Sequence, residues 1–295
     1  MSVGGPPGGG DQHGLPERAV SRLRDLASRQ GTPDHLFTSD LSIAELGLTR
    51  QVGFEPLGQV MGASVYHVGY QWMRASWALS GQSYELDVLT NAYAEARSLA
   101  LSRLKHEAGL LRATAVVGVR LIQRRSDWDG VPLEFSAIGT AVREIAARRS
   151  DDPHKPPVIT TLSGQEYWTL LQAGFRPVGI AAGNCTYYQV SSYRTRQAMS
   201  SVWSAFQNQE LTDYTRSLYT ARALTMNRMN GQARVLGGSG IVDTKIHIDA
   251  EPHHVESNNT QRVDLLYHCT AIGTAIVPWP GPRARPGLSG VIPLT

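Results

Sequence analysis

The chain has 295 residues, with 28 basic and 25 acidic side chains and a formal net charge of +3. This small charge, together with an aromatic content of 7% that is not interleaved with basic residues, argues against nucleic-acid binding. No apolar run approaches the ~18–20 residues needed to span a bilayer, a signal-peptide core is missing, and two cysteines give no disulfide framework. We expect a cytoplasmic protein without a membrane span.

Residues 1–35 are predicted to be a disordered leader that carries a short amphipathic helix. Residues 1–14 are low in complexity and rich in Gly and Pro. Residues 15–29 place apolar side chains on one face, with Pro16 near the start and Gly31 beyond the end. We expect this helix to dock on the protein itself, and the alternative is that it binds a different protein partner.

An internal repeat organises the rest of the chain. Residue 37 aligns with residue 158, and this offset of 121 holds without a gap up to residue 62. The identical positions include Ser42/Ser163, Glu45/Glu166, Gly53/Gly174, Phe54/Phe175, Gly58/Gly179 and Gly62/Gly183. Because a repeat fixes the domain count, we predict a first module at 36–147, a linker at 148–157 and a second module at 158–277.

Each copy begins with the same helix signal, a Ser-x-x-Glu capping box. These are Ser42 with Glu45 and Ser163 with Glu166. A short helix should follow and end at Gly53 in the first copy and at Gly174 in the second, since glycine closes a helix in the left-handed conformation. A strand is predicted directly after each glycine.

A long helix then follows in each copy, marked by apolar or small residues at spacings of three and four. The first stripe is Leu86, Leu89, Tyr93, Ala96, Ala100 and Leu104, and at an offset of 125 the second is Leu211, Tyr214, Leu218, Ala221, Thr225 and Met229. Two strands are predicted after each helix, at 113–123 and 133–143, then at 236–248 and 263–277. The predicted fold class is α+β, with two tandem two-layer β-α-β-β modules that each pack one long helix on an antiparallel sheet. Residues 278–295 form a Pro/Gly-rich tail, expected to be an extended arm.

Three motifs of the first copy resemble the YbjQ-like family, whose usual description is a heavy-metal-binding domain. They are Ala94-x-Ala-Arg-x-x-Ala-Leu-x-Arg-Leu104, Ala113-x-Ala-Val-Val-Gly-Val-Arg120 and Ile138-Gly-Thr-Ala-Val142. The resemblance implies a fold similar to a dodecin subunit and assembly into rings of five. The second copy departs from it, because Gly237-Gly-Ser-Gly240 replaces Ala115-Val-Val-Gly118 and residues 247–261 form an insertion.

That insertion holds the densest set of metal-ligand types in the chain. His247, Asp249, Glu251 and His253 combine imidazole and carboxylate groups, which suits a divalent transition metal such as zinc, nickel or copper. The alternative interpretation is a polar hairpin loop. His268 and Cys269 form a weaker candidate, since Cys269 shares a strand face with apolar residues and is expected in the core while His268 points the other way.

The chain shows no nucleophile elbow, Walker loop or Rossmann fingerprint, so we expect no enzyme and no certain cofactor. The favoured function is a non-enzymatic protein that assembles with itself into a closed ring or larger homo-oligomer, with a five-fold ring expected from the resemblance. One alternative is a heavy-metal-binding or metal-responsive protein. Another is a binder of a small ligand at subunit interfaces.

Overall fold

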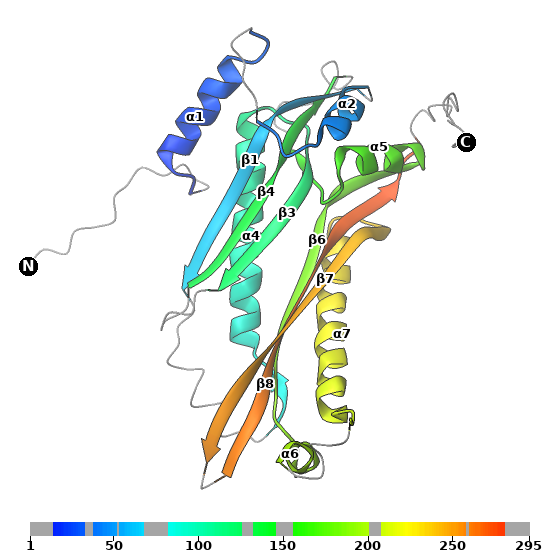
Figure 1. Ribbon diagram of the computed structural model, residues 1–295. Coiled ribbons are helices and arrows are strands. Elements are labelled where there is room, and N and C mark those ends of the chain that lie inside the picture. The colour runs from blue at the N-terminus through cyan, green and yellow to red at the C-terminus, as the bar shows by residue number, and fades with distance from the viewer. Residues whose placement is uncertain are drawn as a thin grey trace, which may run out of the picture.

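The computed structural model shows an α+β protein, as predicted, in which two four-stranded sheets each carry one long helix (Figure 1). It describes residues 14–32, 38–51, 53–67, 82–125, 132–145, 156–200, 208–257 and 260–280. The expected disorder of residues 1–13, most of the linker and the tail beyond residue 280 lie outside the described residues. The first sheet has the strand order β1-β4-β3-β5 and the second has β2-β6-β8-β7.

The element bounds follow the predicted order. In chain order they are α1 (Glu17–Ser28), α2 (Ile43–Gln51), β1 (Phe54–His67), β2 (Tyr84–Glu85), α4 (Asp87–Leu110), β3 (Ala115–Arg125), β4 (Pro132–Glu144), β5 (Val158–Ile159), α5 (Gly164–Gln172), β6 (Phe175–Gln189), α6 (Tyr193–Ser200), α7 (Thr212–Val235), β7 (Gly240–Ser257) and β8 (Thr260–Pro278). Helix α6 and the two-residue strands β2 and β5 were not predicted.

The two halves repeat one topology. Strand β1, helix α4 and strands β3 and β4 form the first β-α-β-β unit, and β6, α7, β7 and β8 form the second. Helices α4 and α7 each have 24 residues and correspond at an offset of 125 from first residue to last. The prediction of matching helices on matching antiparallel sheets is confirmed.

Two short strands tie the halves together. Strand β2 precedes α4 in the chain but pairs with β6 of the second sheet, where Tyr84 lies opposite Tyr188. Strand β5 opens the second half but pairs in parallel with β3 of the first sheet, where Val158 lies opposite Ala115. Each half therefore contributes hydrogen bonds to the other half's sheet.

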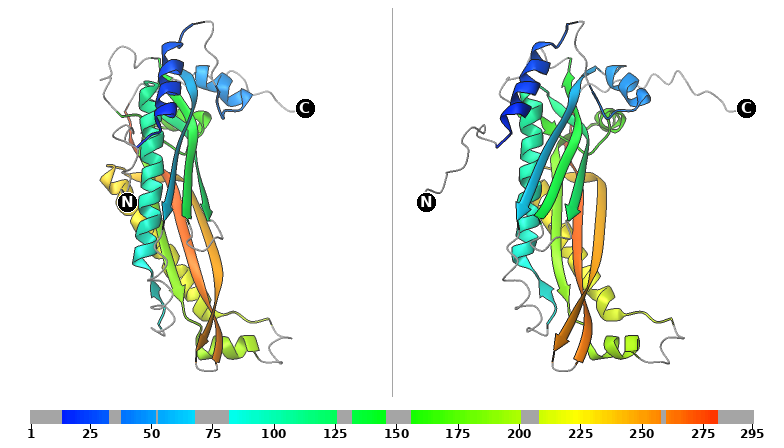
Figure 2. Two further views of the ribbon diagram at one scale, coloured as in Figure 1. Left: turned by 90° about the vertical axis from the view of Figure 1, so that its left-hand side faces the viewer. Right: turned by 60° about the vertical axis from the view of Figure 1, so that its left-hand side comes forward.

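The repeated glycines have a packing cause. A Cβ atom at Gly62 of β1 would lie 2.0 Å from the carbonyl oxygen of Ala100 in α4, and one at Gly183 of β6 would lie 2.1 Å from that of Thr225 in α7. Each long helix thus rests directly on the backbone of its first strand, and Figure 2 shows α4 running the length of the first sheet. Only glycine permits this approach.

Both predicted capping boxes are formed. The backbone N–H of Ser163 donates to Glu166 Oε2 at 2.8 Å, and the N–H of Glu166 donates to Ser163 Oγ at 3.3 Å. The corresponding bonds join Ser42 and Glu45 at 2.8 and 3.2 Å. After each helix a glycine takes a positive φ of 86° (Gly53) or 82° (Gly174), as predicted.

The start of β7 corrects the sequence alignment of the second half. The β-bulge of β3 lies between Val117 and Arg120, and that of β7 lies between Val242 and Lys245, so the offset here is 125 rather than 122. The stretch 237–239 is therefore the turn that ends α7, not a strand. Gly237, with φ of 74°, closes the helix as Arg112, with φ of 55°, closes α4.

The insertion at 247–261 is also different from the predicted hairpin loop. Strand β7 continues through it to Ser257 and pairs with β8 from Thr260 onward, so the insertion lengthens a two-stranded ribbon. The ribbon forms because Ile246, Ile248 and Val255 supply apolar, β-branched side chains at intervals through the polar stretch.

Helix α1 docks on the protein itself, as predicted. Leu23 is fully buried in the core shared with α4, and Leu26 Cδ2 lies 3.2 Å from the position a Cβ would take at Gly58. The guanidinium of Arg22 lies 3.8 Å from the carboxylate of Glu107 on α4. Binding of α1 to a different protein stays a prediction.

Candidate functional site

The four predicted metal ligands lie on one strand. His247, Asp249, Glu251 and His253 alternate along β7, so their side chains leave the same face of the second sheet. A strand rises ~3.3 Å per residue, which places neighbouring members of the set roughly 6.6 Å apart and the end members roughly 20 Å apart. An extended strand cannot bring all four to one ion.

Each of these side chains instead has its own neighbour. His247 Nε2 lies 3.0 Å from Asp249 Oδ2. Glu251 Oε1 lies 3.8 Å from Nε2 of His268, and the ring of His253 meets Tyr188 edge-on at 6.2 Å. Within the described residues no three His, Cys, Asp or Glu side chains gather in a metal-binding arrangement. Among the four candidates, His247 and Asp249 form the one exposed pair whose ligand atoms lie within 3.0 Å of each other.

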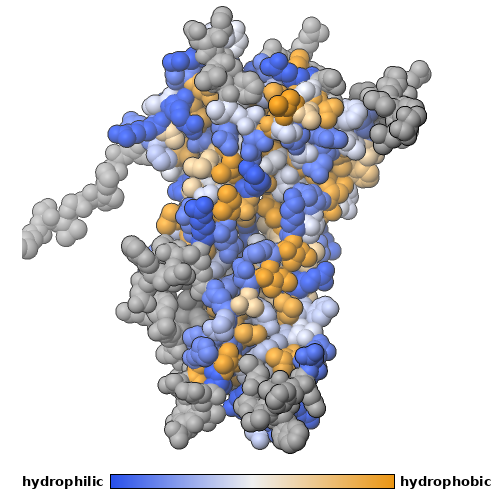
Figure 3. Space-filling model, in the orientation of Figure 1, coloured by the Kyte–Doolittle hydropathy of each residue, from blue (hydrophilic) through white to orange (hydrophobic). Residues whose placement is uncertain are grey.

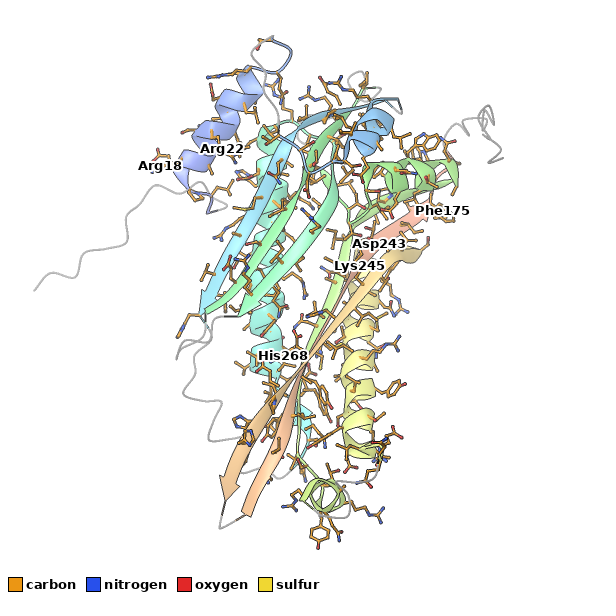
Figure 4. The ribbon with its side chains drawn as sticks, viewed as in Figure 1. Arg18, Arg22, Phe175, Asp243, Lys245 and His268 are labelled. Atoms are coloured by element: carbon orange, nitrogen blue, oxygen red, sulfur yellow. The ribbon has the colours of Figure 1, made fainter. Side chains whose placement is uncertain are left out.

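His268 lies inside the protein, between the two halves. Its side chain is 4% exposed, its Nδ1 lies 3.2 Å from Thr186 Oγ1, and its ring stacks on Tyr93 of α4 at 5.4 Å. Figure 4 shows it where β8 passes α4. The expectation that His268 and Cys269 face opposite ways is therefore confirmed.

Both cysteines are free, buried and part of the core beneath α7. Cys269 lies opposite Cys185 in the β6–β8 register, and both pack with Ala221 of α7. Burial, reinforced by the nearby carboxylate of Glu85, raises the pKa of the Cys185 thiol to about 12, and burial also raises the pKa of Cys269. Because a thiolate is the nucleophile and the metal ligand, neither thiol is prepared for catalysis or metal binding.

The contact between the halves holds a polar network that the sequence did not reveal. Arg97 of α4, 6% exposed, donates to Asn184 Oδ1 of β6 at 2.8 Å, and Asn184 Nδ2 donates to the carbonyl of Thr90 at 2.7 Å. The Thr90 hydroxyl accepts from the backbone N–H of Thr186 at 2.9 Å. Burial lowers the pKa of Arg97 to about 10. The only sequence signal was that Arg97 belongs to the first YbjQ-like motif.

An ion pair between α7 and β2 also joins the two halves. Arg228 of α7 donates two hydrogen bonds to Glu85 of β2, at 2.6 and 2.9 Å, and Thr90 Oγ1 donates to the same carboxylate at 3.0 Å. Burial opposes ionisation of Glu85, but the bonds from Arg228 and Thr90 outweigh it and hold the pKa of Glu85 below its usual value. The contact is therefore well satisfied and fixes one half on the other.

In the part of the chain that the structure describes, the first sheet has no such cover over most of its outer face. On the side away from α4, Met61 is 48% exposed, Val65 is 70% exposed and Ile122 is 38% exposed. Figure 3 shows apolar side chains distributed among polar ones on this side of the molecule. Helices α2 and α5 cover only the upper end, where Tyr167 packs on Phe54 at 5.2 Å. Exposed apolar side chains on a sheet face lose contact with water when another element or chain packs on them.

Two long strands also lie at the edges of the sheets that the structure describes. Strand β7 is an edge strand of 18 residues, and strand β1 is an edge strand of 14 residues. An unpaired edge presents a row of backbone donors and acceptors that can pair with another chain. The structure thus offers two kinds of surface for self-association, an apolar sheet face and long strand edges.

Comparison with known proteins supports the resemblance in the first half of the chain. A family model described as "Putative heavy-metal-binding" (YbjQ) matches residues 57–144. The protein named encapsulin nanocompartment protein Rv1762c, from Mycobacterium tuberculosis, is 39% identical over 261 residues, which cover 87% of this chain and 92% of that protein. No solved structure matches the chain. Among the described helices none is long and apolar enough to cross a membrane.

Proposed function

The chain belongs to the same family as that mycobacterial encapsulin nanocompartment protein, and we propose that it is a non-enzymatic protein that assembles with copies of itself into a closed ring or larger shell. The observation that carries the proposal is the uncovered apolar face of the first sheet, where Val65 is 70% exposed. A monomer would leave this face and the β7 edge in water, whereas an assembly buries both.

The proposed building block is the module of one helix on one sheet, with modules at 36–147 and 158–277. Both modules have the β-α-β-β order that the YbjQ-like resemblance implies. We propose a five-chain ring in which the ten modules either alternate around one ring or stack in two layers. The strands β2 and β5 would hold the two modules of each chain at a fixed mutual orientation, which a closed assembly requires.

Mass photometry and sedimentation velocity of the purified full chain test this proposal. The chain has a mass of 32.2 kDa, so a five-chain ring would weigh five times that, about 161 kDa, and a shell would weigh a larger multiple. A single discrete species of high mass is expected. A stable 32.2 kDa monomer at micromolar concentration would contradict the proposal.

Metal binding is the second candidate function, and the exposed His247–Asp249 pair is the observation in its favour. The side chains are 73% and 51% exposed and lie 3.0 Å apart. Two ligands form half of a site, because zinc and similar ions take three or four protein ligands. We propose that any tight site is completed by a second copy, so that affinity for metal depends on assembly. Binding of a small ligand at subunit interfaces rests on the resemblance alone.

A further inference from the structure

Inside one chain, α4, the long helix of the first half, is covered by the second sheet. On α4, Thr90, Tyr93 and Arg97 are 2%, 4% and 6% exposed. The surface that covers them is the face of the second sheet that points away from α7, where Asn184 and Thr186 are 3% and 2% exposed. This is a heterologous contact, in which the helix side of one unit meets the outer sheet face of the next.

Among the described residues, nothing covers the corresponding side of α7, the long helix of the second half. The positions on α7 equivalent to Thr90, Tyr93 and Arg97, at an offset of 125, are Thr215, Leu218 and Arg222. The first two are half-buried and Arg222 is exposed. On the same side of α7, Tyr219 is 66% exposed. The sequence repeats the helix but the described part of the chain contains no third sheet to cover it.

The first sheet shows the complementary deficit. The positions equivalent to Ala182 and Thr186 of β6, at an offset of 121, are Met61 and Val65 of β1. Ala182 is 3% exposed whereas Met61 is 48% exposed, and Thr186 is 2% exposed whereas Val65 is 70% exposed. The register agrees, since Val65 lies opposite Glu134 and Thr186 lies opposite His268. As far as the described residues go, each chain therefore leaves one side of α7 and one face of the first sheet uncovered.

We propose that the outer face of the first sheet of one copy packs on α7 of the next copy and reproduces between chains the contact of the second sheet with α4 inside the chain. The inference rests on the proposed self-assembly and adds which two surfaces meet. We call them the sheet face (Met61, Ala63, Val65 and Glu134) and the helix face (Thr215, Leu218, Tyr219, Arg222 and Met226).

The side chains on the two surfaces fit each other. Apolar Met61 and Val65 stand where the chain-internal contact has Ala182 and Thr186, and they would meet Leu218 and Met226 on the helix face. Burial of such apolar side chains away from water stabilises a contact. The interface between copies is thus less polar than the one within the chain.

The charges on the two surfaces are also complementary. Arg97 bonds to Asn184 inside the chain, but the position equivalent to Asn184 is Ala63, which has no acceptor for Arg222. The carboxylate of Glu134 on the neighbouring strand lies in the same face, where the second sheet has His268. Glu134 of one copy would therefore pair with Arg222 of the next, since a buried arginine needs a partner.

This contact has a direction, which decides the form of the assembly. Every chain presents one sheet face and one helix face, so each copy binds two neighbours in the same way. A heterologous contact of this kind gives a ring if the rotation between copies closes, and a filament if it does not. A closed ring therefore requires that the rotations between successive units add up to a full turn.

Val65→Asp in the full chain tests the sheet face, with Val88→Asp as its matched control. Val88 is also exposed, at 73%, and it lies on α4 at the position where α7 has Asp213. Mass photometry over a dilution series should show that Val65→Asp raises the concentration for half assembly at least about tenfold, equivalent to ~1.4 kcal/mol, while Val88→Asp leaves it unchanged. Circular dichroism should show both variants folded.

The outcomes separate this interface from the proposed function. If the parent assembles and Val65→Asp assembles equally well, the interface is wrong while self-assembly stands. If the parent is a monomer, both fall. A charge exchange gives a second measurement: Glu134→Arg or Arg222→Glu alone should weaken assembly by like-charge repulsion, and the double variant should restore it. A double variant that stays dissociated overturns the Glu134–Arg222 pairing.

Discussion

Replacement of Gly183 by Ala should destabilise the second half severely because α7 packs directly on the backbone of β6 at this position. The new Cβ would lie 2.1 Å from the Thr225 carbonyl oxygen and 2.8 Å from the Met229 nitrogen, both backbone atoms of α7. Cβ atoms essentially never approach other atoms closer than 3.0 Å. The helix would therefore have to retreat by about an ångström, and a gap of that size forfeits roughly a quarter to a half of the dispersion attraction at each contact.

The size of the effect follows from what α7 buries. Ala221, Thr225 and Met229 are at most 1% exposed and all lie on the side that would lift from the sheet. Overpacking typically costs about 1–3 kcal/mol, and a clash between two backbones belongs at the upper end, so we expect a loss of about 3 kcal/mol. At roughly 2–4 °C per kcal/mol for a chain of this size, the melting temperature should fall by about 6–12 °C.

Differential scanning fluorimetry and urea unfolding of matched variants provide the assay. Gly62→Ala should cost about as much as Gly183→Ala, since its Cβ would lie 2.0 Å from a backbone oxygen of α4. The controls are Gly109→Ala in α4 and Gly231→Ala in α7, where the new Cβ would meet no atom within 4 Å beyond the nearby backbone of its own helix. Each control should instead stabilise by about 0.5–1 kcal/mol, because alanine is the better helix former. A Gly183→Ala protein as stable as the parent would refute the close packing of α7 on β6.

Three further predictions concern charge, thiols and metal. Glu85→Gln should lower the free energy of unfolding by about 1–2 kcal/mol at pH 7, after allowance for solvent around Arg228, because the carboxylate accepts charged hydrogen bonds. The folded state lowers the pKa of Glu85, so the stability that its carboxylate gives is present above its ordinary pKa. That stability should be lost as the pH falls through the lower folded-state pKa. Mass spectrometry should show neither cysteine alkylated by iodoacetamide at pH 8 until urea unfolds the chain, given a Cys185 pKa of about 12; rapid native labelling would contradict the burial. Calorimetry should show that zinc binds to the assembled parent and that His247→Ala removes this binding. His253→Ala should leave the binding nearly intact, because the ring of His253 packs on an aromatic residue. An equal loss of zinc binding in both variants would contradict the geometry of β7.

The predicted metal set shows how the conformation of the backbone decides which candidate ligands can meet. Four ligand-type residues in a short stretch favour a metal site only if the backbone folds back on itself. The stretch was expected to be a loop, but its backbone pairs with β8 and extends, which separates His247 from His253. Proximity along the chain and proximity in space differ most in a strand. The metal site therefore stays a prediction that depends on a second copy.

Residues at the contact between the halves were missed for a related reason. Arginine is almost never fully buried unless it is paired, so the sequence predicts that the side chain of Arg97 on a helix is exposed to solvent. It is buried because the second sheet lies over α4 and supplies Asn184. Strands β2 and β5 are equally hidden in the sequence, because strands of two residues arise from long-range pairing rather than from local propensity.

The sequence by itself determined the repeated unit. Apolar periodicity determined α4 and α7, and the capping boxes determined the short helices, because both depend on interactions within a few residues. The repeated glycines determined the turns and allowed the close helix–sheet contacts, because any side chain at Gly62 or Gly183 would clash with the helix backbone. Only the tertiary structure decided how the two units sit together, which helix is covered, and which face stays exposed. Those outcomes depend on packing between residues roughly 90 or more positions apart, and the chain carries no local signal for them.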